Sequence, residues 1–245
     1  MTDTILFRLE DGLAHITLNR PHKLNALNGD MFAELSQHLD KITPDQVGCV
    51  LIDAAGRSFC AGHDLDDIAD GSEGHAILRM ETLLLERLAN LPMPVVAAVQ
   101  GHCMTGGLEF VLAADIIIAA DTAQFADTHA KWDLVPVWGL SQRLPRRVGL
   151  AKAYEMMFAS RSYSGVQAAE MGLANFCVPA ADLAQEAERF CRDILANSWR
   201  STRAMKKLVL DTDGMSTAAG VAWEIHHTVG RGPEMHERIA RMRRK

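Results

Sequence analysis

Short apolar runs without polar interruption constrain the fold of this chain more than any other feature. Residues 95–99 and 116–119 show no alternation with hydrophilic residues, as expected for strands that are covered on both faces. Two prolines, Pro92 and Pro94, end a helical pattern directly before the first run. Strands of this kind alternate with helices in parallel sheets, so we expect an α/β protein.

The first half of the chain predicts a regular series of strands and helices. Residues 4–9 and 13–18 alternate apolar and other residues around Asp11-Gly12, which indicates a β-hairpin. Asn28 then caps a helix whose apolar residues recur every three or four positions as far as Ile42. The remaining elements expected here are a strand at 49–52, a helix at 77–88 and a helix at 106–113.

The second half is mostly helical. After Pro145 we expect helices at 151–158 and from Ser164 to Met171, and one more strand at 174–178. From about residue 182 onwards only helical patterns remain. The chain is therefore predicted to form a core over 1–181 and an all-helical part over 182–245.

Composition excludes several classes of protein. The chain has 245 residues, of which 48% are hydrophobic, and a formal net charge of −6, so neither nucleic acid nor an anionic membrane is an expected partner. Its five cysteines are odd in number and form no C-x-x-C pair, which suggests neither disulfides nor zinc and fits a reducing cytoplasm. The N-terminus resembles no signal peptide, and Asp115 divides the longest apolar run, so no membrane span is expected.

Two glycine-bearing segments, 56–65 and 101–109, are candidates for a site. Gly62 allows a close backbone approach, and Gly106 opens a helix whose first N–H groups would face an anion or a developing oxyanion. Glu109 follows among apolar residues, where burying a carboxylate is costly. A capping role fails, because a capping box begun by Thr105 would need its glutamate at 108. We therefore expect a catalytic role for Glu109.

Four motifs follow one another along the chain: Asn19-Arg20-Pro21 with Asn25-Ala26-Leu27, Phe59-x-Ala61-Gly62-x-Asp64-Leu65, Gly106-Gly107-x-Glu109, and Pro136-x-x-Gly139-x-x-Gln142-Arg143-Leu144. In their order and spacing they resemble the motifs of the crotonase (enoyl-CoA hydratase/isomerase) family, and the resemblance extends over residues 5–180. It implies a crotonase-like spiral of ββα units with a C-terminal all-helical part. In that family the helical part often packs across the subunits of a homotrimer or of a hexamer.

The resemblance also implies the ligand, an acyl-CoA thioester, with no cofactor beyond the coenzyme A of the substrate. The backbone N–H groups of His63 and Gly106 would form an oxyanion hole for the thioester oxygen, which gains negative charge during the reaction. The residues implied in CoA and substrate binding are Lys23, Ala61, His63, Asp64, Leu65, Asp66 and Gly106. Lys23 is alternatively an ordinary solvated lysine.

Two further groups of charged residues have open interpretations. Asp64, Asp66 and Asp67 offer too few oxygens in a defined loop pattern for a hard cation, so we predict no metal. The basic C-terminus, Arg238 to Lys245, either opposes a helix dipole or meets the phosphates of CoA. Arg57 is a second candidate for contact with CoA.

His129 stands where the hydratases of the family carry the second of two glutamates that hold water, a replacement found in a subset of the family; Glu109 matches the first. An imidazole can accept a proton from water or, as imidazolium, donate one. The alternative is a polar loop residue satisfied by Asp127, Thr128 or Asp133. If His129 faces Glu109, the two should titrate as a coupled pair, and an isomerase using one base becomes as credible as a hydratase.

Three functions therefore follow from the sequence. The first is a hydratase of 2-enoyl-CoA, in fatty acid metabolism, that uses Glu109 and His129. The second is another reaction of the family, namely double-bond isomerisation, thioester hydrolysis or decarboxylation, and the third is a non-catalytic acyl-CoA-binding subunit. Trp132 and Trp138 flank the His129 region and are expected to narrow the acyl pocket, although the sequence does not indicate the acyl chain.

Overall fold

The computed structural model describes residues 3–64, 66–67 and 74–244. Its centre is a six-stranded sheet in the order β1-β2-β3-β4-β6-β9, in which only β1 and β2 pair antiparallel. The strands are β1 (Ile5–Glu10), β2 (Leu13–Leu18), β3 (Cys49–Ala54), β4 (Val95–Val99), β6 (Ile116–Ala120) and β9 (Phe176–Val178). All five residues of β4 are buried, and the expected α/β class is confirmed.

The predicted hairpin is also confirmed. Asp11 and Gly12 both have positive φ, 49° and 81°, which matches the right-handed twist of the two strands they join. The hairpin pairs Ile5 with Leu18 and Glu10 with Leu13.

A small second sheet organises the segments that follow β4 and β6. It consists of β5 (His102–Met104), β7 (Gln124–Ala126) and β8 (Tyr163–Ser164), in that order. β5 and β7 are parallel and pair Met104 with Ala126. The residues that come directly after these two strands, from Thr105 and from Asp127, are therefore brought side by side.

The helices before residue 180 begin where local signals predict them, with one exception. They are α1 (Gly29–Asp40), α3 (His75–Ala89), α4 (Gly106–Val111), α5 (Leu140–Val148), α6 (Leu150–Ala159) and α7 (Gly165–Glu170). Asn28 caps α1 by accepting the Met31 N–H at 3.1 Å, and Ser164 opens α7 with a capping box. The exception is α5, which contains Pro145 and was not expected as a helix.

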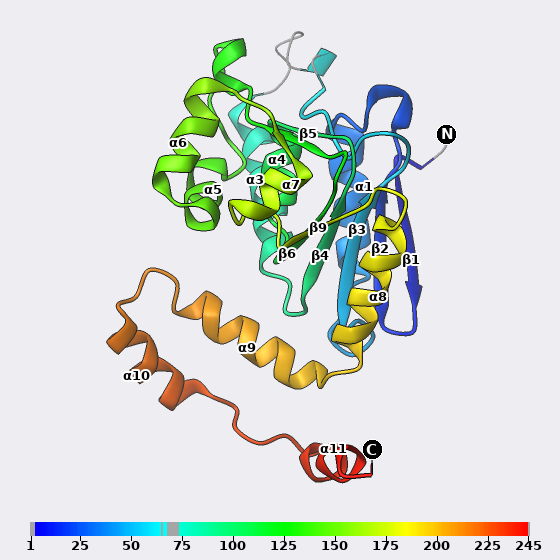
Figure 1. Cartoon of the computed structure of the whole chain (residues 1–245), viewed down its shortest axis with the longest axis vertical. Helices are drawn as coiled ribbons and strands as arrows, with labels where there is room; N and C mark the ends of the chain where they lie inside the picture. Colours follow the sequence, from blue (N-terminus) through cyan, green and yellow to red (C-terminus); the bar gives the residue numbers. More distant parts are fainter. Residues whose placement is uncertain (1–2, 65, 68–73, 245) are drawn as a thin grey trace.

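The rest of the described chain is helical, as predicted, with α8 (Leu183–Leu195), α9 (Trp199–Asp211), α10 (Thr217–His227) and α11 (Met235–Met242). α8 packs on the face of the sheet formed by β2, β3, β4 and β6. Figure 1 shows α9, α10 and α11 extending away from the core. The predicted division of the chain between residues 181 and 182 stays a prediction. In the structure α8, the first helix after this point, packs against the sheet.

Trp199 and Lys206 attach α9 to the core. The indole of Trp199 covers Gly12 and Gly48 so closely that a Cβ on either glycine would lie 2.3 Å from it. Lys206 Nζ lies 2.6 Å from Asp115 Oδ2, at the start of β6. Beyond these contacts α9 to α11 bury no residue completely. Within the described ranges, no helix is both long and apolar enough to cross a bilayer.

Candidate active site

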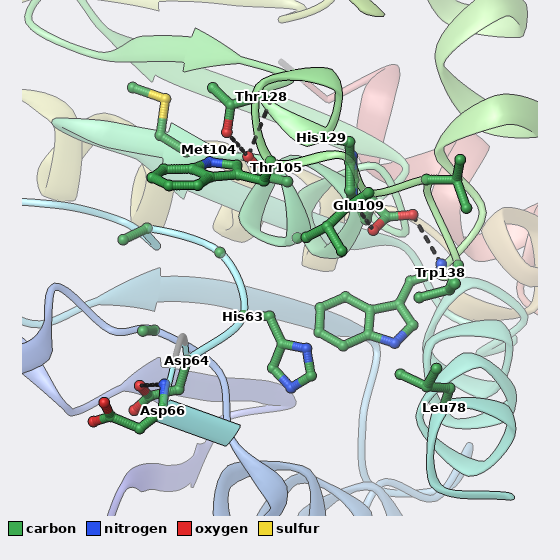
Figure 2. A pocket seen from close by; sticks show the side chains of 18 of the residues that line it. His63, Asp64, Asp66, Leu78, Met104, Thr105, Glu109, Thr128, His129 and Trp138 are labelled. Atoms are coloured by element: carbon green, nitrogen blue, oxygen red, sulfur yellow. Dashed lines mark hydrogen bonds and ion pairs between the residues drawn. The ribbon is translucent and has the colours of Figure 1, made fainter. Parts of the chain in front are cut away.

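A cavity of about 570 Å³ opens where α4, the loop after β7 and the segment around His63 meet. Figure 2 shows the side chains that point into it. The cavity brings together most residues predicted for the site: Lys23, Ala61, His63, Asp64, Asp66, Gly106, Glu109 and His129. Trp132 and Trp138 line it as well. Leu65 lies outside the described residues.

Two backbone segments meet at one wall of this cavity. A Cβ on Gly106 would lie 3.1 Å from the backbone nitrogen of His63, and a Cβ on Gly62 would lie 3.4 Å from the nitrogen of Gly106. The two predicted oxyanion donors are therefore neighbours in space, although they are far apart in sequence. Gly106 is the first residue of α4, so its N–H has no partner inside the helix.

The turn before α4 is held in an unusual conformation. Thr105 has φ 51° and ψ −110°, which a residue with a Cβ adopts only at an energetic cost. Its N–H donates to the carbonyl of Ala126, and its hydroxyl bonds that of Thr128. These contacts tie the start of α4 to the loop that carries His129 (Figure 2).

Glu109 is almost completely buried, with 1% of its surface exposed. One oxygen, Oε1, accepts the backbone N–H groups of Trp138 at 2.8 Å and of Leu140 at 3.2 Å. Burial raises the pKa of the Glu109 carboxyl, and the opposing effects of His129 and of these two N–H groups do not cancel it. The second oxygen, Oε2, faces His129 Nε2 at 3.5 Å. Glu109 is thus a carboxyl with a raised proton affinity and one oxygen open to the cavity.

His129 has two carboxylate neighbours. Its Nδ1 lies 2.6 Å from Oδ1 of Asp127, which is also buried, and its Nε2 is the atom that faces Glu109. Both interpretations of the sequence are therefore met in part, since His129 is satisfied locally by Asp127 and yet lines the cavity. The contribution of Asp127 was seen in the sequence only as one of three alternatives.

Trp138 packs directly against the glycine segments, because a Cβ on Gly106 would lie 2.6 Å from its ring. Its ring lies 4.9 Å from that of His63, and its Nε1 donates to the buried carboxylate of Glu81 at 3.2 Å. Burial lowers the pKa of His63, against the attraction of Asp67 and Asp64, which favours the neutral imidazole there. The Trp138 wall was predicted from sequence, whereas Glu81 gave no signal because it is one polar position in an ordinary amphipathic helix.

Two ion pairs involve residues that line the cavity. Lys23 Nζ lies 2.7 Å from Asp66 Oδ2, and hydrogen bonding to Asp66 raises the pKa of Lys23. Arg20 contacts Asp64 at 2.8 Å; burial opposes ionisation of Asp64, but the bond to Arg20 lowers its pKa overall. Lys23 is therefore an exposed cation beside the cavity, already paired with one carboxylate.

Other candidates lie away from this site. α11 is at the end of the molecule opposite β5 (Figure 1), and Arg238 and Arg241 pair there with Glu234 and Glu237. Within one chain the basic C-terminus therefore does not reach the cavity. Among the residues that the structure describes, no group of three or more His, Cys, Asp or Glu side chains is arranged to hold a metal.

Comparison with known proteins identifies one family. The family model described as enoyl-CoA hydratase/isomerase matches residues 8–229. A Mycobacterium bovis protein named probable enoyl-CoA hydratase echA8 is 33% identical, with 91% of this chain and 87% of that protein aligned. The 1,2-epoxyphenylacetyl-CoA isomerase of Escherichia coli K12 is 32% identical, with 98% and 95% aligned.

Solved structures agree with this result. The enoyl-CoA hydratase of Bacillus anthracis superimposes with a TM-score of 0.92 at 28% identity, covering 98% of this chain and 96% of that one. A Thermobifida fusca protein in complex with acetoacetyl-CoA gives a TM-score of 0.85 at 26% identity, covering 99% and 96%. The fold that the sequence motifs implied, a spiral core with a C-terminal helical part, is confirmed.

Proposed function

Because this chain belongs to the enoyl-CoA hydratase/isomerase family, we propose that it adds water to the double bond of a 2-enoyl-CoA thioester. One observation carries the proposal: a buried carboxyl, Glu109, and a buried imidazole, His129, lie side by side, 3.5 Å apart, in the lining of the cavity that His63 and Gly106 also line. Such a pair can bind one water molecule on its cavity side and exchange its protons.

The backbone N–H groups of His63 and Gly106 are proposed to bind the thioester oxygen. When water attacks the β-carbon, the electrons of the double bond move toward this oxygen and leave it negatively charged. Preorganised donors stabilise that charge most where water is excluded. The close approach of Gly62 and Gly106, where a Cβ would fill the space between the segments, supports this role.

The remaining cavity residues are proposed to bind the acyl-CoA. Ala61, Asp64 and Asp66 lie on the segment that passes from the oxyanion donors to the mouth, where Lys23 adds a cation for a phosphate. Leu65 belongs to the same proposed contact by sequence. Trp132 and Trp138 bound the cavity and are proposed to limit the acyl group. The Thermobifida fusca neighbour in complex with acetoacetyl-CoA supports this class of ligand.

A second candidate is isomerisation of an acyl-CoA without net addition of water. The similarity to the 1,2-epoxyphenylacetyl-CoA isomerase of Escherichia coli, which covers nearly the whole chain, favours it. The replacement of a second glutamate by His129 is compatible with it, because one group can remove a proton and return it elsewhere. Thioester hydrolysis, decarboxylation and a purely binding role have less support in the geometry.

The deciding experiment incubates the purified protein with crotonyl-CoA and with a longer 2-enoyl-CoA, and follows loss of the conjugated thioester absorbance together with product analysis. A 3-hydroxyacyl-CoA product whose formation falls sharply in Glu109→Gln and His129→Ala supports the hydratase. A product of unchanged mass with a moved double bond supports the isomerase. Binding of CoA without turnover of any thioester would contradict both and leave a binding subunit.

We also propose that α9 to α11 form contacts between copies of this chain. Their apolar side chains are exposed in the single chain, among them Val209 at 71%, Ile225 at 69% and Met242 at 81%. Exposed apolar side chains on three successive helices fit a surface that another copy of the chain covers. Light scattering on the purified protein distinguishes a trimer or hexamer from a monomer. A cytoplasmic location stays a prediction that the five free cysteines support.

A further inference from the structure

His129 is held between two buried carboxylates that come from different elements. Asp127 follows β7 in the same loop, whereas Glu109 projects from α4. Their exposed fractions are 1% each, and that of His129 is 7%. Glu109 and His129 have proposed catalytic roles, whereas Asp127, the third buried member of the cluster, has none so far.

The hydrogen bonds of Asp127 indicate which atom carries the proton in its contact with His129. Asp127 Oδ1 accepts the backbone N–H of His129 at 3.1 Å and also lies 2.6 Å from His129 Nδ1. An oxygen that already accepts one N–H is a poor site for a proton of its own, whereas an imidazole nitrogen can carry one. The proton in the short contact therefore belongs to Nδ1.

The same reasoning applies to Glu109. Its Oε1 accepts two backbone N–H groups, from Trp138 and Leu140, so any proton that Glu109 carries belongs on Oε2. Oε2 is the atom that faces His129 Nε2 at 3.5 Å. Once Nδ1 is occupied, Nε2 and Oε2, which face each other, are the atoms of His129 and Glu109 that can carry a mobile proton.

We propose that Asp127 is a positioning residue that keeps a proton on His129 Nδ1 and so reserves Nε2 and Glu109 Oε2 for the protons that the reaction transfers. This inference rests on the proposed function, because it gives the two groups their protonation states for the reaction. The contact between Asp127 Oδ1 and His129 Nδ1 also fixes the orientation of the ring, so that Nε2 points toward Glu109.

With this arrangement the site returns to its starting state after each addition of water. At the start His129 is imidazolium and Glu109 is ionised. Water gives one proton to Glu109 Oε2 while its oxygen bonds the β-carbon, and the electrons of the double bond form the enolate. The α-carbon of the enolate then takes the proton of His129 Nε2. One water has been added, and the proton left on Oε2 passes to Nε2 to restore the pair.

Few other charges act on this cluster. η2 (His129–Trp132), which contains His129, packs against α6, and there Lys152 and Glu155 pair with each other at 2.7 Å. Lys131 and Asp133, on the same segment as His129, are exposed. Among the described contacts, Asp127 and Glu109 are the charged groups that touch the ring of His129.

The test compares Asp127→Asn, which keeps the size of the side chain but removes its charge, with Asp133→Asn, a matched change on the exposed neighbour. In Asp127→Asn we expect kcat for hydration of the 2-enoyl-CoA to fall about 10²–10⁴-fold with little change in KM, and the pH–rate profile to change shape. Asp133→Asn should retain the kinetics of the unchanged protein. Equal kinetics in all three proteins would overturn the proposal.

A second readout does not depend on turnover. Proton and nitrogen NMR of protein labelled at histidine, with His129→Gln to assign the signal, reports which ring nitrogen carries the proton. We expect a protected, strongly downfield Nδ1 proton for His129 that is lost or moved in Asp127→Asn. A proton on Nε2 with Nδ1 unprotonated in the unchanged protein would refute the proposal. If the signal is as expected but no thioester turns over, the proposed function fails and the positioning of His129 by Asp127 stands.

Discussion

Replacing Glu109 by glutamine is expected to abolish most activity and at the same time to stabilise the fold. Glutamine keeps the acceptor for the N–H groups of Trp138 and Leu140, but it carries no charge into the interior and cannot take a proton from water. Loss of a general acid or base lowers kcat by about 10²–10⁴-fold. The gain in stability follows from the burial that raises the pKa of Glu109.

The sign and size of this gain depend on pH. Since the pKa of Glu109 is higher in the folded than in the unfolded protein, the folded protein holds the proton more tightly and loses stability as pH rises through the folded value. Each tenfold difference in proton affinity corresponds to about 1.4 kcal/mol. We therefore expect Glu109→Gln to exceed the unchanged protein in free energy of unfolding at pH 8, and to exceed it little below pH 4.5, the ordinary value for the group.

Urea unfolding of both proteins at equal chain concentration, repeated from pH 4 to pH 8, measures this difference. A gain of 1 kcal/mol should raise the melting temperature by about 2–4 °C in a chain of this size. Glu188→Gln, on the exposed face of α8, is the control and should show no such dependence on pH. A Glu109→Gln protein that is less stable at pH 8, or whose advantage does not grow with pH, would refute the reasoning.

Three other changes test separate parts of the structure. Gly106→Ala would place a Cβ 2.6 Å from Trp138 and 3.1 Å from the nitrogen of His63, and should lower kcat about 10²–10³-fold. Gly220→Ala, whose Cβ would lie 3.7 Å from its nearest neighbour, is the control and should leave kcat unchanged. Equal activity of the two variants would contradict the proposed oxyanion site. Trp199→Ala should cost about 2–4 kcal/mol in urea unfolding because α9 loses its cover over Gly12 and Gly48, and a loss below 1 kcal/mol would show that α9 is held elsewhere. Lys23→Ala should weaken CoA binding roughly tenfold by calorimetry, more at low salt than at high salt, and leave thermal unfolding unchanged; unaltered affinity would remove Lys23 from the binding site.

Elements with strong local signals were predictable from the sequence. β4 lies at residues 95–99 as expected, and the caps at Asn28 and Ser164 begin their helices. β5, β7 and β8 were not predicted, because these strands of two or three residues lie in no longer apolar run, unlike β9, and form through pairing with one another.

α5 was missed for a different reason. Pro145 lies inside it and normally ends a helix. The helix persists because tertiary contacts hold it: Leu140 and Leu144 are buried, and Arg143 donates to the carbonyl of Trp138. Such contacts outweigh local propensity and cannot be read from a short stretch of sequence.

The members of the site were easier to predict than their arrangement. Glu109 stood out as a charge in an apolar stretch, and His129 through the family motif. Which oxygen of Glu109 meets His129 depends on the backbone of Trp138 and Leu140, and the short contact with Asp127 depends on how the loop after β7 turns. These contacts depend on the pairing of β5 with β7.

The position of α8 has a consequence for the order in which the protein acquires its structure during synthesis. β2, β3, β4 and β6 have all left the ribosome once residue 120 has emerged, but the helix that covers one face of these strands is made only at residues 183–195. Throughout that interval the growing chain carries a bare apolar sheet face, a surface that favours aggregation or chaperone binding. In a fragment ending at residue 181 this face of the sheet would stay exposed permanently. The core can therefore be covered only once α8 has been synthesised.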